Sequence, residues 1–157
     1  MKNLPTEKLS KIEKETIAEI RAMRARTGSN QPELSFGSPV QLVHHFILSS
    51  HGNVQLRISV IARELGVGMR TLERAFAREY QQTMSQCQVQ VRLSFSKWML
   101  SLFPPTKISV VAALLGYEQV QDFNRFFKKH VNQPPSDWSS GEQKRDDDAA
   151  ENPSRNR

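Results

Sequence analysis

The chain has 157 residues, of which 38% are hydrophobic, and a formal net charge of +6. This length can bury one core or two small adjacent cores, and it leaves no room for a further large domain. The positive excess lies on residues 39–140, where 11 Lys and Arg face 6 Asp and Glu. Such a surplus suits a polyanionic partner, but many ordinary domains are equally basic, so charge alone does not define the function.

Several classes of protein are disfavoured at once. A single cysteine, Cys87, allows no internal disulfide, and the four histidines lack zinc-ligand spacing, so we expect no metal and no cofactor. Cys87 has no activating partner nearby in the sequence, and we expect no catalytic site. No apolar run is long enough for a membrane span, and the N-terminus lacks a signal-peptide core. A cytoplasmic protein that does not contact membranes is expected.

The N-terminal region, residues 1–37, is expected to hold one amphipathic helix and a linker. Residues 6–27 have a thin apolar stripe among many charges, and residues 28–37 are rich in Gly, Ser, Asn and Pro. So narrow a stripe does not stabilise a helix in water without a partner surface. We therefore expect this helix to fray in the free protein and to order against a partner, such as a second copy of the chain or another protein. The stripe consists of Leu9, Ile12, Ile17, Ile20 and Met23.

The chain contains one short pattern twice, fifty positions apart. Residues 58–66 and 108–116 both begin Ile-Ser-Val, carry apolar residues at i, i+3, i+4 and i+7, and end in glycine. Ser59 and Ser109 are available as helix N-caps. Gly66 and Gly116 can adopt the left-handed conformation that ends a helix and turns the chain sharply.

A second matching piece follows each copy: Leu72-x-Arg74-x-Phe76 and Phe123-x-Arg125-x-Phe127. Two helix-turn-helix (HTH) motifs, at about 58–80 and 108–131, are therefore predicted. A helix starting at Ser38-Pro39 would cover the first motif, and a connecting helix at about 84–103 would end before Pro104-Pro105. The predicted fold is all-α. It comprises two HTH subdomains joined by a long helix in a domain at 38–140, an N-terminal amphipathic helix, and a disordered polar tail at 141–157.

The second helix of each motif has a polar face opposite its apolar face, and its residue types can read bases. Arg pairs with guanine, Asn and Gln with adenine, and Glu with cytosine. A polar stripe alone is usually only the solvated side of a helix, but here it recurs with an aligned Arg behind a tight turn. We therefore predict base contacts from Arg70, Glu73, Arg74, Gln121, Asn124 and Arg125. Phosphate contacts are predicted from Thr71, Arg78, Lys97, Lys128 and Lys129.

Residues from about Ser38 to Ser140 resemble the DNA-binding domain of the AraC/XylS family of bacterial transcription regulators. The resemblance implies two recognition helices in successive major grooves of double-stranded DNA, and regulation that is often activation through contact with RNA polymerase. It rests on Ile58-Ser59-x-x-Ala62, Leu72-x-Arg74-x-Phe76, Arg92, Met99-Leu100, Ile108-Ser109-x-Val111-Ala112, Gly116-Tyr117, Phe123-x-Arg125-x-Phe127-Lys128 and Pro135-Ser136-Asp137-Trp138.

The sequence departs from the family pattern where Gln81 and Asn132 stand in place of glycine, and a left-handed turn at either position would cost free energy. The region before Ser38 is too short for the ligand-sensing domain of larger members. The leading hypothesis is a sequence-specific DNA-binding regulator, either stand-alone or a remnant of a longer one. The alternative is a protein-interaction module that has lost specific DNA binding and acts through its N-terminal helix or its tail.

Overall fold

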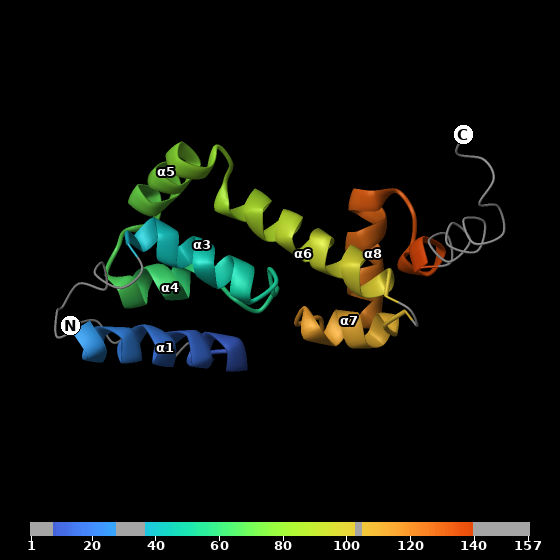
Figure 1. Cartoon of the computed structure of the whole chain (residues 1–157), viewed down its shortest axis with the longest axis horizontal. Coiled ribbons are helices and arrows are strands. Elements are labelled where there is room, and N and C mark those ends of the chain that lie inside the picture. Colours follow the sequence, from blue (N-terminus) through green and yellow to red (C-terminus); the bar gives the residue numbers. More distant parts are fainter. Residues whose placement is uncertain (1–7, 28–36, 103–104, 140–157) are drawn as a thin grey trace, which may run out of the picture. The chain divides into compact units, whose positions relative to one another are not determined.

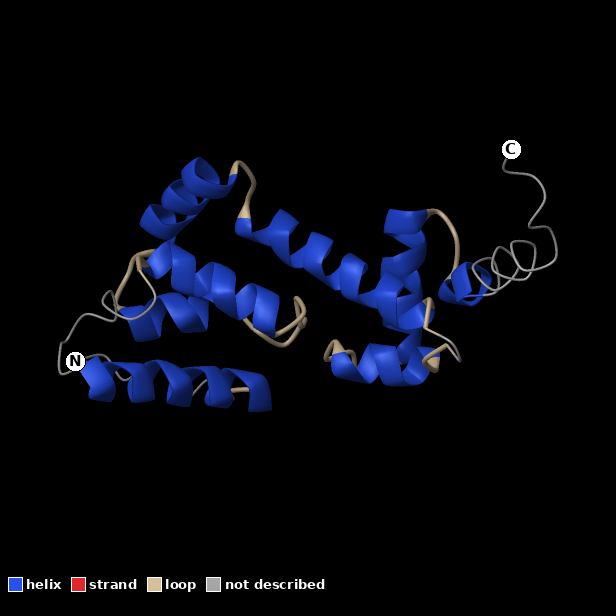
Figure 2. Cartoon of the chain, viewed as in Figure 1, coloured by secondary structure: helices blue, strands red, loops and turns tan. Residues whose placement is uncertain are grey.

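The computed structural model describes residues 8–27, 37–102 and 105–139 (Figure 1). These residues form helices and connecting loops, and no strand occurs among them (Figure 2). The predicted all-α fold is therefore confirmed. The expected linker, apart from Gly37, and the expected tail at 141–157 lie outside the described residues.

The chain divides into two compact units, Met1–Val89 and Gln90–Arg157. The helices of the first unit are α1 (Lys11–Thr27), α3 (Pro39–Ser49), α4 (Ile58–Leu65) and α5 (Met69–Tyr80), and α6 (Met84–Leu100) starts in it. The rest of α6 belongs to the second unit with α7 (Ile108–Leu114), α8 (Val120–Val131) and a short helical stretch at 135–139. The helix pairs α4/α5 and α7/α8 lie where the two HTH motifs were predicted.

The start of α3 follows the predicted cap. The Ser38 hydroxyl accepts from the backbone N–H of Gln41 at 3.4 Å, the Gln41 side chain accepts from the backbone N–H of Ser38 at 3.3 Å, and Pro39 occupies the first helical position. The caps expected at Ser59 and Ser109 are wrong. The N-cap of α4 is Arg57, two positions before Ser59, because the carbonyl of Arg57 already accepts from the N–H of Val60 at 3.1 Å. Lys107 is likewise the N-cap of α7, two positions before Ser109.

The turns behave as the sequence predicts. Gly66 and Gly116 have φ angles of +72° and +83°, in the left-handed region that glycine enters at least cost. Gln81 and Asn132, which end the two recognition helices, have φ angles of +56° and +63° without being glycine. The chain therefore carries some backbone strain just after each recognition helix.

The core of the first unit is formed by the apolar faces of α3, α4 and α5. Phe76 and Ile61 are fully buried and Leu72 is 1% exposed, so the recognition helix α5 rests on its predicted apolar stripe. The remaining buried core residues on these three helices are Val40, Leu42, Val43, Phe46, Ile47, Ile58, Val60, Ala62 and Leu65.

Helix α1 does not fray in the structure: it packs against α4, beside which it lies in Figure 1. Its buried face consists of Glu13, Thr16, Ile20 and Met23, so the predicted apolar stripe describes only part of the contact. The expectation of a free helix was wrong because it counted only apolar residues, whereas two of the four buried residues of α1, Glu13 and Thr16, are polar. Hydropathy patterning could not show that a buried carboxylate would be satisfied by a residue 44 positions away.

The second unit has its own core, in which Phe123, Phe127, Val111 and Leu115 are fully buried. The ring centroids of Phe123 and Phe127 are 5.9 Å apart, and Trp138, from the helical stretch at 135–139, meets Phe127 edge-on at 6.2 Å. Burial of both phenylalanines fixes the face of α8 that remains exposed.

Candidate nucleic-acid interface

Helix α5 presents a polar face opposite the buried Leu72 and Phe76. The three side chains predicted to read bases, Arg70, Glu73 and Arg74, are all exposed on it. The Arg74 side chain has no hydrogen-bond or ion-pair partner among the described residues, so its guanidinium keeps all its donors for a ligand. The face assignment made from periodicity holds for this helix.

The C-terminal end of α5 is anchored to α3. The His44 ring stacks on the Tyr80 ring at a centroid distance of 4.0 Å and an interplanar angle of 23°. Burial lowers the pKa of His44, although Glu79 opposes this, so the stack holds a neutral imidazole at pH 7. Nearby, the Gln41 amide donates to the Glu79 carboxylate at 3.2 Å. These contacts hold the C-terminal end of α5 against α3.

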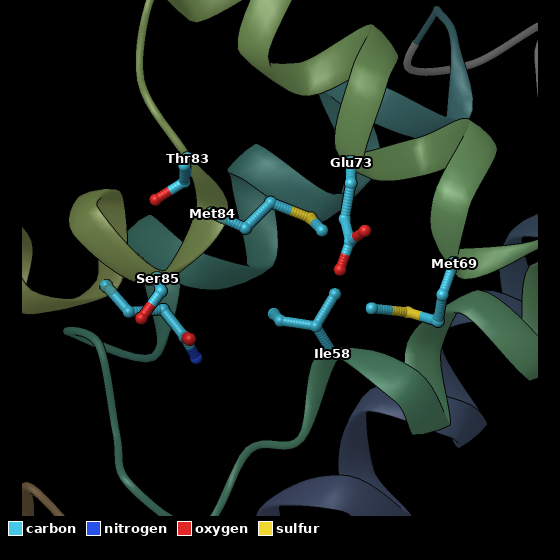
Figure 3. Close-up of a pocket in the computed structure, with 7 residues that line it drawn as sticks. Ile58, Met69, Glu73, Thr83, Met84 and Ser85 are labelled. Carbon is cyan, nitrogen blue, oxygen red and sulfur yellow. The ribbon is translucent and has the colours of Figure 1, made fainter.

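Glu73 borders a pocket of about 330 Å³ at the start of α4, α5 and α6. Figure 3 shows its carboxylate pointing toward Ile58, between the side chains of Met69 and Met84. The sequence placed Glu73 on the reading stripe, and the residue is exposed there. Its carboxylate would have to swing out of this pocket to accept a hydrogen bond from a base.

Helix α8 repeats the arrangement around Phe123 and Phe127. Gln121 and Arg125 are exposed as predicted, but Asn124 is half-buried. The side-chain carbonyl oxygen of Asn124 is buried and accepts no hydrogen bond in the structure. An unsatisfied buried acceptor is costly. Asn124 is therefore the predicted base-reading residue whose present orientation fits that role least.

An acidic residue holds the aligned arginine of α8. The Asp122 carboxylate accepts from the Arg125 guanidinium at 2.5 Å, and both side chains are largely exposed. Aligning the two copies of the repeat places Thr71 of α5 at the position of Asp122. The two aligned arginines therefore differ: the Asp122 carboxylate orients Arg125, whereas no side chain in the described residues restrains Arg74. The i, i+3 spacing of Asp122 and Arg125 could have revealed this pair in the sequence.

Arg92 ties α8 to α6 within the second unit. Its guanidinium lies 4.9 Å from the ring centroid of Phe126 and 6.0 Å from that of Tyr117. Burial raises the pKa of the Tyr117 hydroxyl, and Arg92 partly offsets this because a positive charge favours the phenolate. Cation–π contacts of this kind stabilise an arrangement without using the exposed face of α8.

The side chains predicted to contact phosphates divide into two groups. Thr71, Arg78, Lys128 and Lys129 are exposed on the recognition helices. Lys97 is half-buried, and its ammonium lies 4.8 Å from the centroid of the Trp138 ring. A phosphate would have to compete with this ring for the Lys97 charge. Lys97 thus has a structural partner that the sequence did not predict.

The described residues offer neither a metal site nor a membrane-spanning helix. In the parts of the chain that the structure describes, no cluster of three or more His, Cys, Asp and Glu side chains could hold a metal ion. None of the helices in those parts combines the length and the apolar character that crossing a bilayer requires.

Comparison with known proteins points to one family. A family model described as "Helix-turn-helix domain" matches residues 61–141, which is 81 of the 157 residues. No curated protein sequence shows significant similarity to the chain.

Solved structures share the fold. The C-terminal domain of the two-component response regulator yesN from Fusobacterium nucleatum is 24% identical with a TM-score of 0.56, over 63% of this chain and 95% of that domain. A DNA-binding transcriptional dual regulator from Escherichia coli K-12 is 20% identical with a TM-score of 0.55, over 68% and 94%. A probable AraC family transcriptional regulator from Rhodopseudomonas palustris is 21% identical with a TM-score of 0.52, over 66% and 96%.

The family match over more than half of the chain, together with the shared fold, therefore places the protein among the HTH proteins of DNA-binding transcription regulation. Within that class, the chain belongs to the AraC/XylS family, as its sequence motifs predicted.

Proposed function

We propose that the protein binds double-stranded DNA sequence-specifically, with α5 and α8 in successive major grooves, and thereby activates transcription. One observation carries the proposal. Each recognition helix buries an apolar pair, Leu72 and Phe76 or Phe123 and Phe127, and exposes an aligned arginine between them. A single such face is common on amphipathic helices, but its repetition behind a similar glycine turn is typical of a DNA-reading surface.

The exposed side chains support distinct base contacts. Arg74 and Arg125 can each donate two hydrogen bonds to O6 and N7 of guanine, and Gln121 can contact N6 and N7 of adenine. Arg70 is a further candidate for guanine, Glu73 for cytosine and Asn124 for adenine, the last two after the side chain turns outward. Thr71, Arg78, Lys128 and Lys129 would contact phosphates and position the protein without specifying sequence.

The length of α6 agrees with this proposal. Its 17 residues extend about 25 Å at about 1.5 Å per residue. Successive major grooves on one side of DNA are about 34 Å apart. One connecting helix with an HTH motif at each end is thus of the right order to serve two grooves from a single chain. We therefore expect one monomer per DNA site.

Activation through contact with RNA polymerase rests on the family resemblance alone. As a regulator that acts on bacterial DNA, the protein would work in the cytoplasm. The alternative is a protein-interaction module without specific DNA binding. It was supported by the expectation that the N-terminal helix has no docking surface within the chain and is therefore available to a protein partner. Because α1 is docked on α4, that support is lost for this helix.

The test is selection of bound sequences from random duplex DNA, followed by affinity measurement at several salt concentrations. We expect one enriched bipartite site, with the logarithm of the affinity falling by about 0.9 per neutralised phosphate against log salt. Arg125→Ala should weaken binding to the enriched site. Arg26→Ala, which removes the same charge from the exposed end of α1, serves as the matched control. No enriched sequence, or a footprint that needs two chains, would count against the proposal.

A further inference from the structure

Helix α4 carries charged residues at the wrong ends for an isolated helix. Its N-cap is Arg57, and Glu64 is its penultimate residue. The partial charge of a helix is positive at the N-terminus and negative at the C-terminus, so both side chains face a partial charge of their own sign. The Arg57 side chain also provides no capping hydrogen bond. Arg63 in the last turn has the favourable sign, and the remaining compensation has to come from outside α4.

Helix α1 supplies the missing negative charge at the N-terminal end. The Glu13 side chain is 1% exposed, and its carboxylate accepts from Arg57 Nε at 2.6 Å and Nη2 at 2.9 Å. The same carboxylate accepts from the backbone N–H of Arg57 at 3.2 Å and from that of Ser10 at 2.9 Å. The Ser10 hydroxyl in turn donates to the carbonyl of Gln55 at 3.0 Å. The start of α1 thus holds the loop that leads into α4.

Helix α1 also supplies positive charge at the C-terminal end of α4. Arg21 donates to both carboxylate oxygens of Glu64, at 2.9 and 3.2 Å. Arg24 donates to the backbone carbonyl of Glu64 at 2.6 Å, where the carbonyls of the last turn have no helical partner. Both ends of α4 are therefore satisfied by the same neighbouring helix.

The spacing of these contacts fits two helices that run in the same direction. From Glu13 to Arg21 the rise along α1 is about 12 Å, and from Arg57 to Glu64 the rise along α4 is about 11 Å. Between the two attachment points, Ile20 is fully buried. The ionic contacts at both ends, with Ile20 buried between them, define one register of α1 along α4. Sliding α1 along α4 by one helical turn would break both contacts.

The second HTH motif provides an internal comparison. Alignment of the repeats sets Arg57, Val60 and Glu64 of α4 against Lys107, Val110 and Leu114 of α7. Val60 is 2% exposed, whereas Val110 is 44% and Leu114 49% exposed. The acidic residue that receives the α1 arginines is absent from α7. The site for α1 is thus specific to the first motif and is not a general property of the repeat.

We propose that α1 is a clamp on the first HTH motif and that Glu13 is a positioning residue for DNA reading by α5. This proposal rests on the proposed function. Helix α4 packs against α5 and is joined to it by the tight turn at Gly66, so the seat of α4 sets the direction of the recognition helix. Affinity for the half of the DNA site that α5 reads therefore depends on α1, and affinity for the other half does not.

The experiment uses the full chain and the duplex obtained by selection, in two forms that each have one half-site scrambled. Arg74→Ala first establishes which half α5 reads. Glu13→Gln keeps the size of the side chain and removes its charge. We expect it to weaken binding at least tenfold to the duplex that retains the α5 half-site, and less than threefold to the other. Glu15→Gln, an exposed neighbour on α1, is the matched control and should change neither.

A charge exchange at the other end keeps the test valid if Glu13→Gln unfolds the first unit. Glu64→Arg alone should lose affinity for the α5 half-site, and adding Arg21→Glu should restore most of it, because the opposite charges again face each other. Hydrogen exchange gives a readout without DNA: amides of α4 and α5 should lose protection in Glu13→Gln, while those of α8 should not.

The outcomes separate the two proposals. If the wild-type chain enriches no duplex, the proposed function fails, and the exchange data alone still decide whether α1 holds α4. If the wild type binds but the Glu13→Gln variant keeps its α5 half-site affinity and its amide protection, the clamp is refuted. Equal losses on both half-sites, with no rescue by the charge exchange, would also refute it.

Discussion

The buried Glu13 makes the stability of the first unit depend on pH. Burial alone would raise the pKa of this carboxyl. Hydrogen bonds from the Arg57 side chain, from the backbone N–H groups of Ser10 and Arg57, and the Arg57 charge outweigh burial and lower the pKa from 4.5 to about 2. The carboxylate therefore stabilises the folded state fully above the unfolded-state pKa of 4.5, and this stabilisation is lost as the pH falls toward 2.

The size of the effect follows from the shift. A lowering by about 2.5 pKa units corresponds to about 3 kcal/mol of unfolding free energy, at about 1.36 kcal/mol per unit. The linkage relation places roughly 2 kcal/mol of this loss between pH 7 and pH 3. In the Glu13→Gln variant this contribution is absent at every pH. The difference in stability between wild type and variant should therefore shrink by about 2 kcal/mol between pH 7 and pH 3.

Urea unfolding of both proteins, followed by far-UV circular dichroism and by hydrogen exchange of α4 amides, would measure this difference. Trp98 and Trp138 both lie in the second unit, so their fluorescence gives an internal control that should not respond to the substitution. A stability difference that stays constant from pH 7 to pH 3 would refute the reasoning, because it would show that Glu13 titrates alike in the folded and unfolded chains.

Three further predictions concern the reading faces and the turns. Arg125→Ala should cost about 1–3 kcal/mol of specific DNA affinity with an unchanged melting temperature, whereas Phe127→Ala should cost about 3–5 kcal/mol of stability by opening a core cavity; early melting of the arginine variant instead would reverse the face assignment. Asp122→Asn should strengthen non-specific binding and narrow the ratio of specific to non-specific affinity, since it frees the Arg125 guanidinium. Glu118→Gln, which removes the same charge in the adjacent turn, is the control and should leave that ratio unchanged. If both variants changed the ratio equally, Asp122 would act only through its charge and not by orienting Arg125. Gly66→Ala should destabilise the first unit in thermal unfolding, because φ is +72°, which disfavours a side chain. The cost should stay at about 1 kcal/mol, because nothing lies within 4 Å of the added methyl group. An unchanged melting temperature would show that the turn relaxes freely.

The sequence alone determined the features that depend on local periodicity. The two HTH motifs, the glycine turns, the long helix after Thr83 and the buried faces of α5 and α8 all follow from apolar spacing over one or two helical turns. The non-glycine residues Gln81 and Asn132 at left-handed turns were likewise visible in the sequence. Local rules suffice where a residue's neighbours in space are also its neighbours along the chain.

Tertiary structure decided what depends on distant partners. Glu13 and Arg57 are 44 positions apart, so no local pattern marks Glu13 as buried or α1 as docked. The same holds for Lys97, whose charge meets the ring of Trp138. A polar side chain is stable in the interior only when a specific partner satisfies it, and the identity of that partner is a property of the folded chain.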